Sequence, residues 1–88
     1  MTDRIESLSE RVGVVHAILQ PARAPAPWFQ RELRKRGDVQ VSLRTVYRWL
    51  DSGVTDDYRW IVEAVLLNLT IEAANKLSDA METLEGVL

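Results

Sequence analysis

Apolar residues recur at spacings of three and four through most of the second half of the chain, and this periodicity constrains the fold more than any other feature. The stripe comprises Val62, Leu66, Leu69, Ala73, Leu77, Ala80 and Leu84. Such spacing places side chains on one face of an α-helix, whereas a strand requires alternation at period two. It predicts a C-terminal helical region over residues 56–85, capped by Thr55, ended by Gly86, and formed by one helix or by two that divide near residues 68–70.

The first half of the chain is also predicted to be helical. A second stripe, with the same spacing, predicts a helix over residues 3–20 with Thr2 as its N-cap; its members are Ile5, Leu8, Val12, Val15 and Leu19. Residues 21–27 hold all three prolines and predict a stiff connector. Residues 27–53 then predict two short helices: one from Pro27 to the stop at Gly37, and one that Ser42 caps and that runs to about Asp51. The fold class is therefore all-α, a single domain of 88 residues with four or five helices.

Composition excludes several classes of protein. The chain has no cysteine and one histidine, so a disulfide framework and a thiolate zinc site are excluded, and we expect no metal and no cofactor. No set of residues resembles a catalytic triad, a carboxylate pair or a glycine-rich phosphate loop, so we expect no enzyme. No apolar run approaches the roughly 20 residues of a membrane helix, and the charged N-terminus is unlike a signal peptide. We therefore expect a cytoplasmic protein without a membrane partner.

Charge is distributed unevenly along the chain. The net charge is −2, but residues 21–50 carry seven of the eleven Lys and Arg residues and only two acids. Residues 51–88 carry eight acids against two basic residues. A polyanion responds to local potential over about 8–10 Å, so the basic middle says more about partners than the average does. A solvated face remains the alternative interpretation of such a charge excess.

The helix after Ser42 combines an apolar side with a polar side. Leu43, Val46, Trp49 and Leu50 are predicted to face the core, and Trp28 and Trp60 are predicted to be core or core-edge residues as well. The opposite side, near the helix start, holds residues that suit contacts with base edges in a major groove: Arg44, Thr45, Tyr47 and Arg48. Phosphate contacts are predicted for Arg31, Arg34, Lys35, Arg36, Gln40 and Ser42.

The segment from Val41 to Leu50, followed by Ser52 and Gly53, resembles the recognition helix of helix-turn-helix DNA-binding proteins, with the phage repressor and Cro-like group as the nearest match. The resemblance implies sequence-specific binding of double-stranded DNA, usually as a homodimer on a two-fold site. It implies a transcriptional regulator, such as a repressor, that blocks or recruits RNA polymerase. The turn before Val46 is about three residues longer than in that group.

Pairing of two copies requires an apolar surface. The C-terminal stripe predicts the dimer interface, with Leu66, Leu69, Ala73, Leu77, Ala80 and Leu84 as its residues; the N-terminal stripe is a second candidate. The core of the monomer is the competing use of either stripe. Two other functions stay open: a DNA-packaging or replication accessory protein that forms a ring, like a phage small terminase subunit, and a protein-interaction module that docks an acidic partner without binding DNA.

Overall fold

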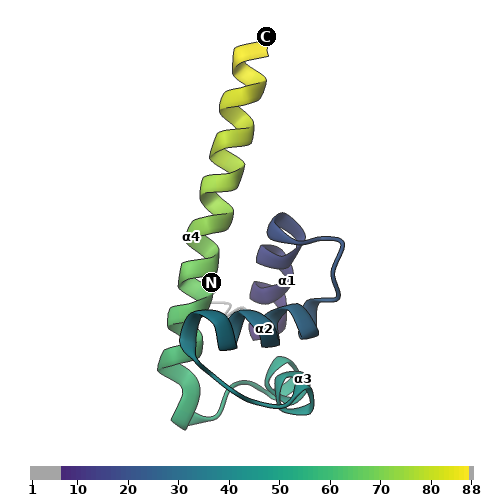
Figure 1. The fold of residues 1–88 in the computed structure, drawn as a ribbon, viewed down its shortest axis with the longest axis vertical. Helices are drawn as coiled ribbons and strands as arrows, with labels where there is room; N and C mark the ends of the chain where they lie inside the picture. The colour runs from purple at the N-terminus through teal and green to yellow at the C-terminus, as the bar shows by residue number, and fades with distance from the viewer. Residues whose placement is uncertain (1–6, 88) are drawn as a thin grey trace, which may run out of the picture.

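Four α-helices make up the part of the chain that the computed structural model describes, residues 7–87, and no strand occurs among these residues. They are α1 (Leu8–Leu19), α2 (Pro25–Gly37), α3 (Leu43–Ser52) and α4 (Asp56–Val87). The first half of α4 packs against the other helices, while its second half projects beyond them along the long axis of the molecule (Figure 1). The all-α prediction is confirmed, and the C-terminal region is one helix.

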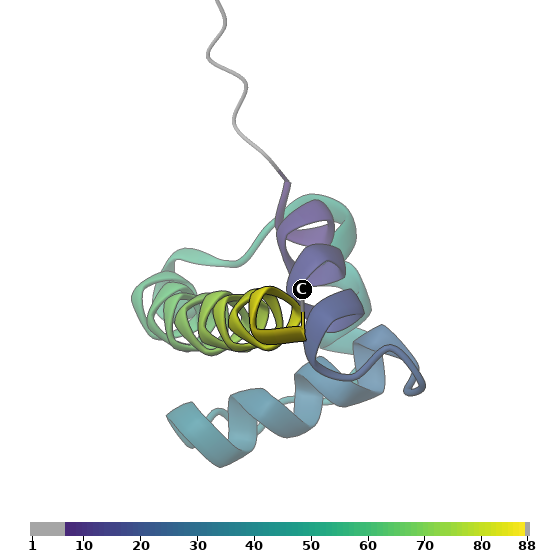
Figure 2. The same ribbon diagram turned by 90° about the horizontal axis from the view of Figure 1, so that it is seen from above.

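All four helices contribute to one small core. The largest fully buried side chains are Val12, Phe29, Leu33, Val46, Val62, Leu66 and Leu69. Seen along the projecting helix, α1 and α2 cover only part of the circumference of α4 (Figure 2). The rest of α4 is therefore open to solvent, so several residues that the sequence places in a core or an interface are exposed.

α1 begins later than the sequence pattern indicates. Ser7 is the N-cap: its hydroxyl accepts a hydrogen bond from Glu10 N at 3.1 Å, and the Glu10 side chain returns a bond to Ser7 N. This reciprocal capping box satisfies two free amides, so the helix begins at Leu8 and not at residue 3. Thr2 and Ile5 lie outside the described residues.

α2 begins two residues earlier than predicted, at Pro25, and includes Gly37 instead of stopping there. Proline suits the first helical position because it has no amide hydrogen to leave unbonded. Asp38 ends the helix in the left-handed conformation (φ 53°), with its amide bonded to the Arg34 carbonyl at 3.1 Å. Asp38 thus takes the capping role that the sequence suggested for Gly37, because an aspartate tolerates this conformation better than most residues.

Gly37 instead allows α2 to approach α4 closely. A methyl group at this position would lie 2.8 Å from Val65 Cγ2 and 3.2 Å from Ile61 Cγ1. These distances are shorter than normal carbon–carbon contacts, so any larger residue would push the two helices apart.

Arg36 fastens the same crossing with polar contacts. Its guanidinium donates to Glu32 Oε1 and to Glu72 Oε2, each at 2.5 Å, and to the Asn68 side-chain oxygen. Burial lowers the pKa of Arg36, but the hydrogen bonds and charges of the two glutamates outweigh this effect and raise it above its ordinary value. The prediction that Arg36 contacts phosphate was therefore wrong, because its donors already bond Glu32 on α2 and Asn68 and Glu72 on α4.

The residues of the predicted dimer stripe on α4 lie in two different environments. Leu66, Leu69 and Ala73 are buried in the core of the monomer, so their assignment to a dimer interface was wrong. Leu77, Ala80 and Leu84 lie on the projecting part and are exposed. The helix continues unbroken through residues 68–70, and Gly86 lies inside it and does not end it.

We expect Gly37→Ala to lower the free energy of unfolding by about 1–2 kcal/mol, because overpacking at the α2–α4 contact exceeds the gain in helix propensity. Gly13→Ala is the matched control: Gly13 lies inside α1 with no heavy atom within 4 Å of the added methyl. It should raise stability by about 0.5–1 kcal/mol. Urea denaturation of both variants measures the difference, and a stabilised Gly37→Ala protein would contradict the close contact.

A second prediction concerns acid. Arg11 donates to both carboxylate oxygens of Glu63, at 2.6 and 2.9 Å, and joins α1 to α4. These hydrogen bonds lower the pKa of Glu63 against an opposing effect of burial, with the charges of Arg11 and Arg59 adding to the decrease. A carboxyl whose pKa is lower in the folded state stabilises fully above its ordinary value of 4.5, and this contribution disappears as the pH falls through the folded value.

The Tm difference between the wild type and Glu63→Gln should therefore be largest near pH 6 and shrink below about pH 4. Glu82→Gln is the control, because Glu82 is exposed on the projecting part of α4 and has no bonded partner among the described residues. A Tm difference for Glu63→Gln that is constant over this range would contradict the role of the ion pair.

Candidate nucleic-acid interface

The start of α3 is fixed by a cap and by an anchored loop. The Ser42 hydroxyl accepts from Thr45 N at 3.1 Å, which confirms Ser42 as the N-cap. The preceding loop is held to α2 by Gln30, whose side-chain amide donates to the Val41 carbonyl at 2.9 Å, and by the buried side chain of Val39. The first turn of α3 is therefore held in a defined position relative to α2.

One face of α3 is buried, as its sequence predicts. Val46 is fully buried and Trp49 is 3% exposed, while Leu43 and Leu50 are partly buried against the same core. α3 packs against α1 and α2, and the ring of Trp49 lies 5.3 Å from that of Tyr58 at the start of α4. These contacts determine which residues of α3 face solvent.

The opposite face of α3 carries the predicted base-contacting residues. Arg44 and Arg48 are exposed and lie four positions apart, one helical turn, on the side away from Val46. Tyr47 flanks them and is 55% exposed. Thr45 is half-buried, and its hydroxyl is 3.1 Å from that of Ser42. The two arginines are therefore accessible on this face, with Thr45 and Tyr47 beside them.

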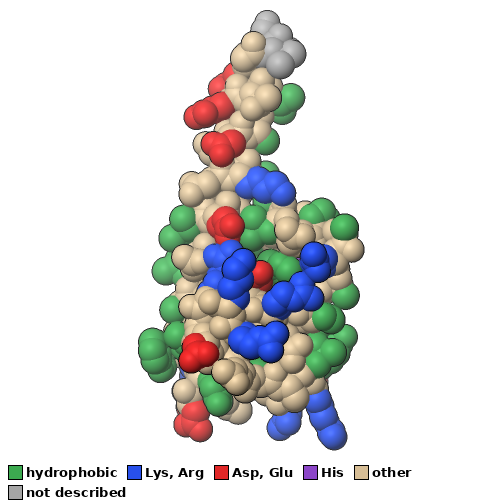
Figure 3. Space-filling view, viewed as in Figure 1, with side chains coloured by type: hydrophobic (Ala, Val, Ile, Leu, Met, Phe, Trp, Pro, Cys, Tyr) green, Lys and Arg blue, Asp and Glu red, His purple; other side chains and the backbone are tan. Residues whose placement is uncertain are grey.

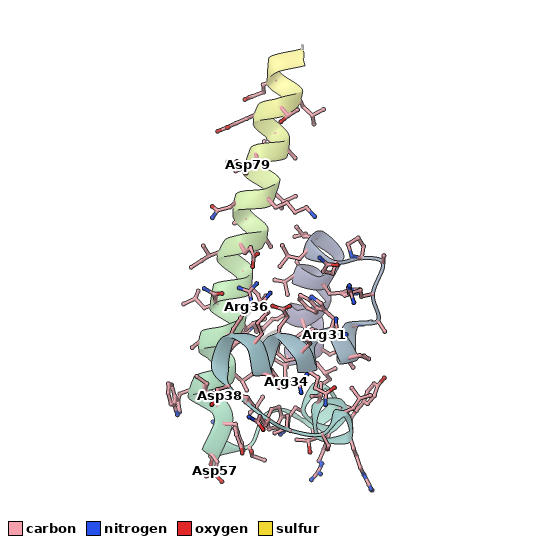
Figure 4. All side chains as sticks on the ribbon, in the orientation of Figure 1. Arg31, Arg34, Arg36, Asp38, Asp57 and Asp79 are labelled. Atoms are coloured by element: carbon pink, nitrogen blue, oxygen red, sulfur yellow. The ribbon has the colours of Figure 1, made fainter. Side chains whose placement is uncertain are left out.

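α2 adds a second group of exposed cations. Arg31, Arg34 and Lys35 are exposed on this helix, and Figure 4 shows Arg31 and Arg34 on the part of α2 nearest to α3. Arg34 and Gln40 line the same small depression of about 80 Å³ beside the loop to α3. The structure thus brings the predicted phosphate-contacting residues to α2 and the adjoining loop, and Arg36 differs from the others because its guanidinium bonds Glu32, Asn68 and Glu72.

Pairing with carboxylates divides the basic residues into two sets. Arg11, Arg36 and Arg59 each form ion pairs with glutamates or aspartates. Within residues 7–87, no ion pair or side-chain hydrogen bond involves the side chain of Arg23 in the connector or those of five residues on α2 and α3, which we call the unpaired basic set: Arg31, Arg34, Lys35, Arg44 and Arg48. Lys76 belongs to neither set, because it donates to the Ile18 carbonyl. Charges without an internal partner keep their full attraction for an external anion.

Basic side chains are concentrated at one end of the molecule, where a few aspartates, including Asp38 and Asp57, also lie (Figure 4). Lys and Arg side chains gather over α2 and at the end of the molecule beside α3, while acidic side chains line the projecting part of α4 (Figure 3). Asp79, for example, lies on that projecting part, far from α3 (Figure 4). The α2–α3 end therefore carries more basic than acidic side chains on α2 and α3, although the chain as a whole is slightly acidic.

The tryptophans divide between core and surface. Trp28 and Trp49 are buried as predicted, but Trp60 is 73% exposed, so its assignment to the core was wrong. It lies near the start of α4 on the side that α1 and α2 leave open. His16 packs edge-on against Trp28, with ring centroids 5.6 Å apart, and its Nε2 contacts the Arg23 carbonyl.

The described residues contain no group of three or more His, Cys, Asp or Glu side chains that could hold a metal ion. None of their helices combines the length and the apolar character that a membrane crossing requires. No protein-family model matches the chain, and searches of curated proteins and of solved structures find no match.

Two substitutions of Ser42 test whether its hydroxyl caps α3. Ser42→Ala should lower stability by about 1 kcal/mol, because Thr45 N loses its acceptor. Ser42→Asp keeps a capping oxygen and should preserve stability, while it places a negative charge beside Arg44 and Thr45. Thermal unfolding of both variants tests the cap; equal losses of stability would contradict it.

Proposed function

We propose that the protein binds double-stranded DNA through α3, with the first two turns of this helix in the major groove. The observation that carries the proposal is the unpaired basic set on two adjacent elements, with Arg44 and Arg48 at the centre of the exposed face of α3. A helix enters the major groove with exposed polar residues near its N-terminus, and the arginine fork bonds guanine O6 and N7 together.

Under this proposal α2 and α3 act as a helix-turn-helix. Arg44, Arg48, Thr45 and Tyr47 contact bases, and the other polar residues hold the backbone: Arg31, Arg34, Lys35, Gln40 and Ser42. The Gln30–Val41 hydrogen bond keeps the two groups in a constant relation, so that phosphate contacts determine which base pairs the arginines reach.

The proposal extends to a homodimer that regulates transcription in the cytoplasm, by blocking or recruiting RNA polymerase at an operator. A single helix with two arginines discriminates weakly, because each bidentate contact contributes about 1–3 kcal/mol. Two copies on half-sites about 34 Å apart would roughly double the specific part of the binding free energy.

Selection of bound fragments from random duplex DNA tests the proposal directly. At moderate salt we expect a short consensus that repeats with two-fold symmetry. A protein-interaction module would give no shift on any duplex, even at low salt, and this result would refute DNA binding. A packaging-type ring would bind DNA without a palindromic consensus.

The two classes of contact predict different mutant behaviour. Arg44→Ala should weaken binding to the selected site by about 1–3 kcal/mol and relax the preference at one position. Lys35→Ala, the control, should weaken specific and random DNA equally and reduce the salt dependence by about one counterion. Fluorescence anisotropy on both DNAs at several salt concentrations measures this, and equal losses of specific and random binding in both variants would contradict the roles assigned here.

A further inference from the structure

The open side of α4 carries an uninterrupted heptad pattern of exposed residues. Its members are Leu67, Thr70, Ala74, Leu77, Met81 and Leu84, spaced three and four apart in strict alternation. We call them the outer seam. The four large apolar members are 50–64% exposed, and Trp60 lies seven positions before Leu67 in the same register. An alternation of this kind is the pattern by which two helices pack along their length.

The outer seam continues into a groove at the head of the molecule. α1 and α4 enclose an open groove of about 610 Å³ lined by Arg11, Val14, Val15, Glu63, Leu67 and Thr70. Val14 on α1 is 58% exposed and Leu67 on α4 is 60% exposed. A helix that follows the seam would therefore cover the apolar surface of both helices.

The projecting part of α4 has no other helix of the described residues packed against it within the monomer. From Ala74 to Gly86 every residue is exposed, although the helix continues to Val87. Isolated helices of about 12–15 residues are marginally stable in water, so packing on an apolar face is the usual source of their stability.

The charges around the seam indicate which partner fits. The acids of the projecting part, Asp79, Glu82 and Glu85, lie outside the seam positions. Glu85 flanks Leu84, and in a parallel pair it would face the uncharged Ala80 of the second copy. Glu63, the one carboxylate in the seam's register, is bonded by Arg11. Between Leu67 and Leu84, two copies of this helix can therefore meet along the seam without like charges facing each other, whereas pairing at the level of Glu63 would bring two Glu63–Arg11 ion pairs together.

We propose that the outer seam pairs with the same seam of a second copy of this chain, in parallel, about a two-fold axis along α4. Parallel orientation rests on the proposed DNA binding. α3 lies at the end of the molecule opposite to the C-terminus (Figure 1), so only a parallel pair presents both α3 helices to one duplex. The outer seam shares Leu77 and Leu84 with the stripe that the sequence pattern indicated. It differs toward the head of the molecule, where Leu66, Leu69 and Ala73 are buried within the monomer.

Oligomeric state without DNA is the first measurement, by light scattering on a sizing column at about 100 µM, because association depends on concentration. The wild type should be a dimer, and Leu77→Glu should dissociate at least about 100-fold more readily, since it places facing charges in an apolar seam. Asn75→Glu is the matched control: it adds the same charge off the seam and should remain dimeric. A monomeric or ring-forming wild type, or an equal effect of both variants, would overturn the proposal.

Orientation is tested by disulfide formation, because the chain has no cysteine of its own. In a parallel seam Met81 meets Met81 of the second copy, so Met81→Cys should form a disulfide between copies under mild oxidation. In an antiparallel pair centred on Ala74, Met81 would meet Leu67, and Met81→Cys would stay unlinked. A dimer without this disulfide overturns the parallel seam, and Asp79→Cys should not link in either case.

These outcomes are independent of DNA binding. The double variant Arg44→Ala with Arg48→Ala should lose specific DNA and keep the dimer, since both residues lie on α3, away from the seam. Loss of DNA binding in the wild type with a retained, linkable dimer would refute the proposed function alone. A monomeric wild type that still selects a DNA sequence would refute the seam alone. The helical circular dichroism of each variant confirms that it folds.

Discussion

The contact of α2 with α4 is the constraint on which the rest of the molecule depends. It combines the absence of a side chain at Gly37, which lets the helix ends approach, with the hydrogen bonds from Arg36 to Glu32, Glu72 and Asn68. Glu32 is almost fully buried, and its carboxylate pairs with the Arg36 guanidinium at 2.5 Å. α2 in turn holds the loop and α3 through Gln30, so the α2–α4 contact helps to position α3, together with its packing against α1 and the contact of Trp49 with Tyr58.

Because α4 projects away from the other helices, its second half lies far from the surface formed by α2 and α3. The basic α2–α3 surface lies at one end of the molecule, and the acidic projecting helix extends from the other (Figures 1 and 3). The acids of the projecting part, Asp79, Glu82 and Glu85, are thereby kept away from the surface proposed to meet a polyanion, whereas Asp38 and Asp51 lie at the basic end. An acidic chain can in this way carry a local positive surface, because screening limits the effect of distant charges to about a Debye length.

Sequence patterns predicted correctly those features that depend on contacts between residues close together in the chain. Ser42 was recognisable as a cap because its bond to Thr45 N lies within one helical turn, and Val46 and Trp49 were recognisable as the inner face of α3 because their spacing is helical. The proline connector was harder: Pro25 and Pro27 suit a first turn equally well, and only the backbone decides between them. Whether Arg44 and Arg48 touch DNA stays a prediction.

The sequence by itself determined the helices, their inner faces and the uneven charge, since spacing, capping and composition act between neighbours along the chain. The tertiary structure alone decided which exposed or charged residues remain available to a partner. Arg34 and Arg36 cannot be told apart within a basic run of the sequence. Of these two, only Arg36 bonds carboxylates of the described residues: that of Glu32 on the same helix and that of Glu72, 36 positions further along the chain. Likewise Leu66 and Leu77 belong to one stripe, yet one is covered by α1–α3 and the other projects beyond them, because the length of α4 exceeds that of the head against which it packs.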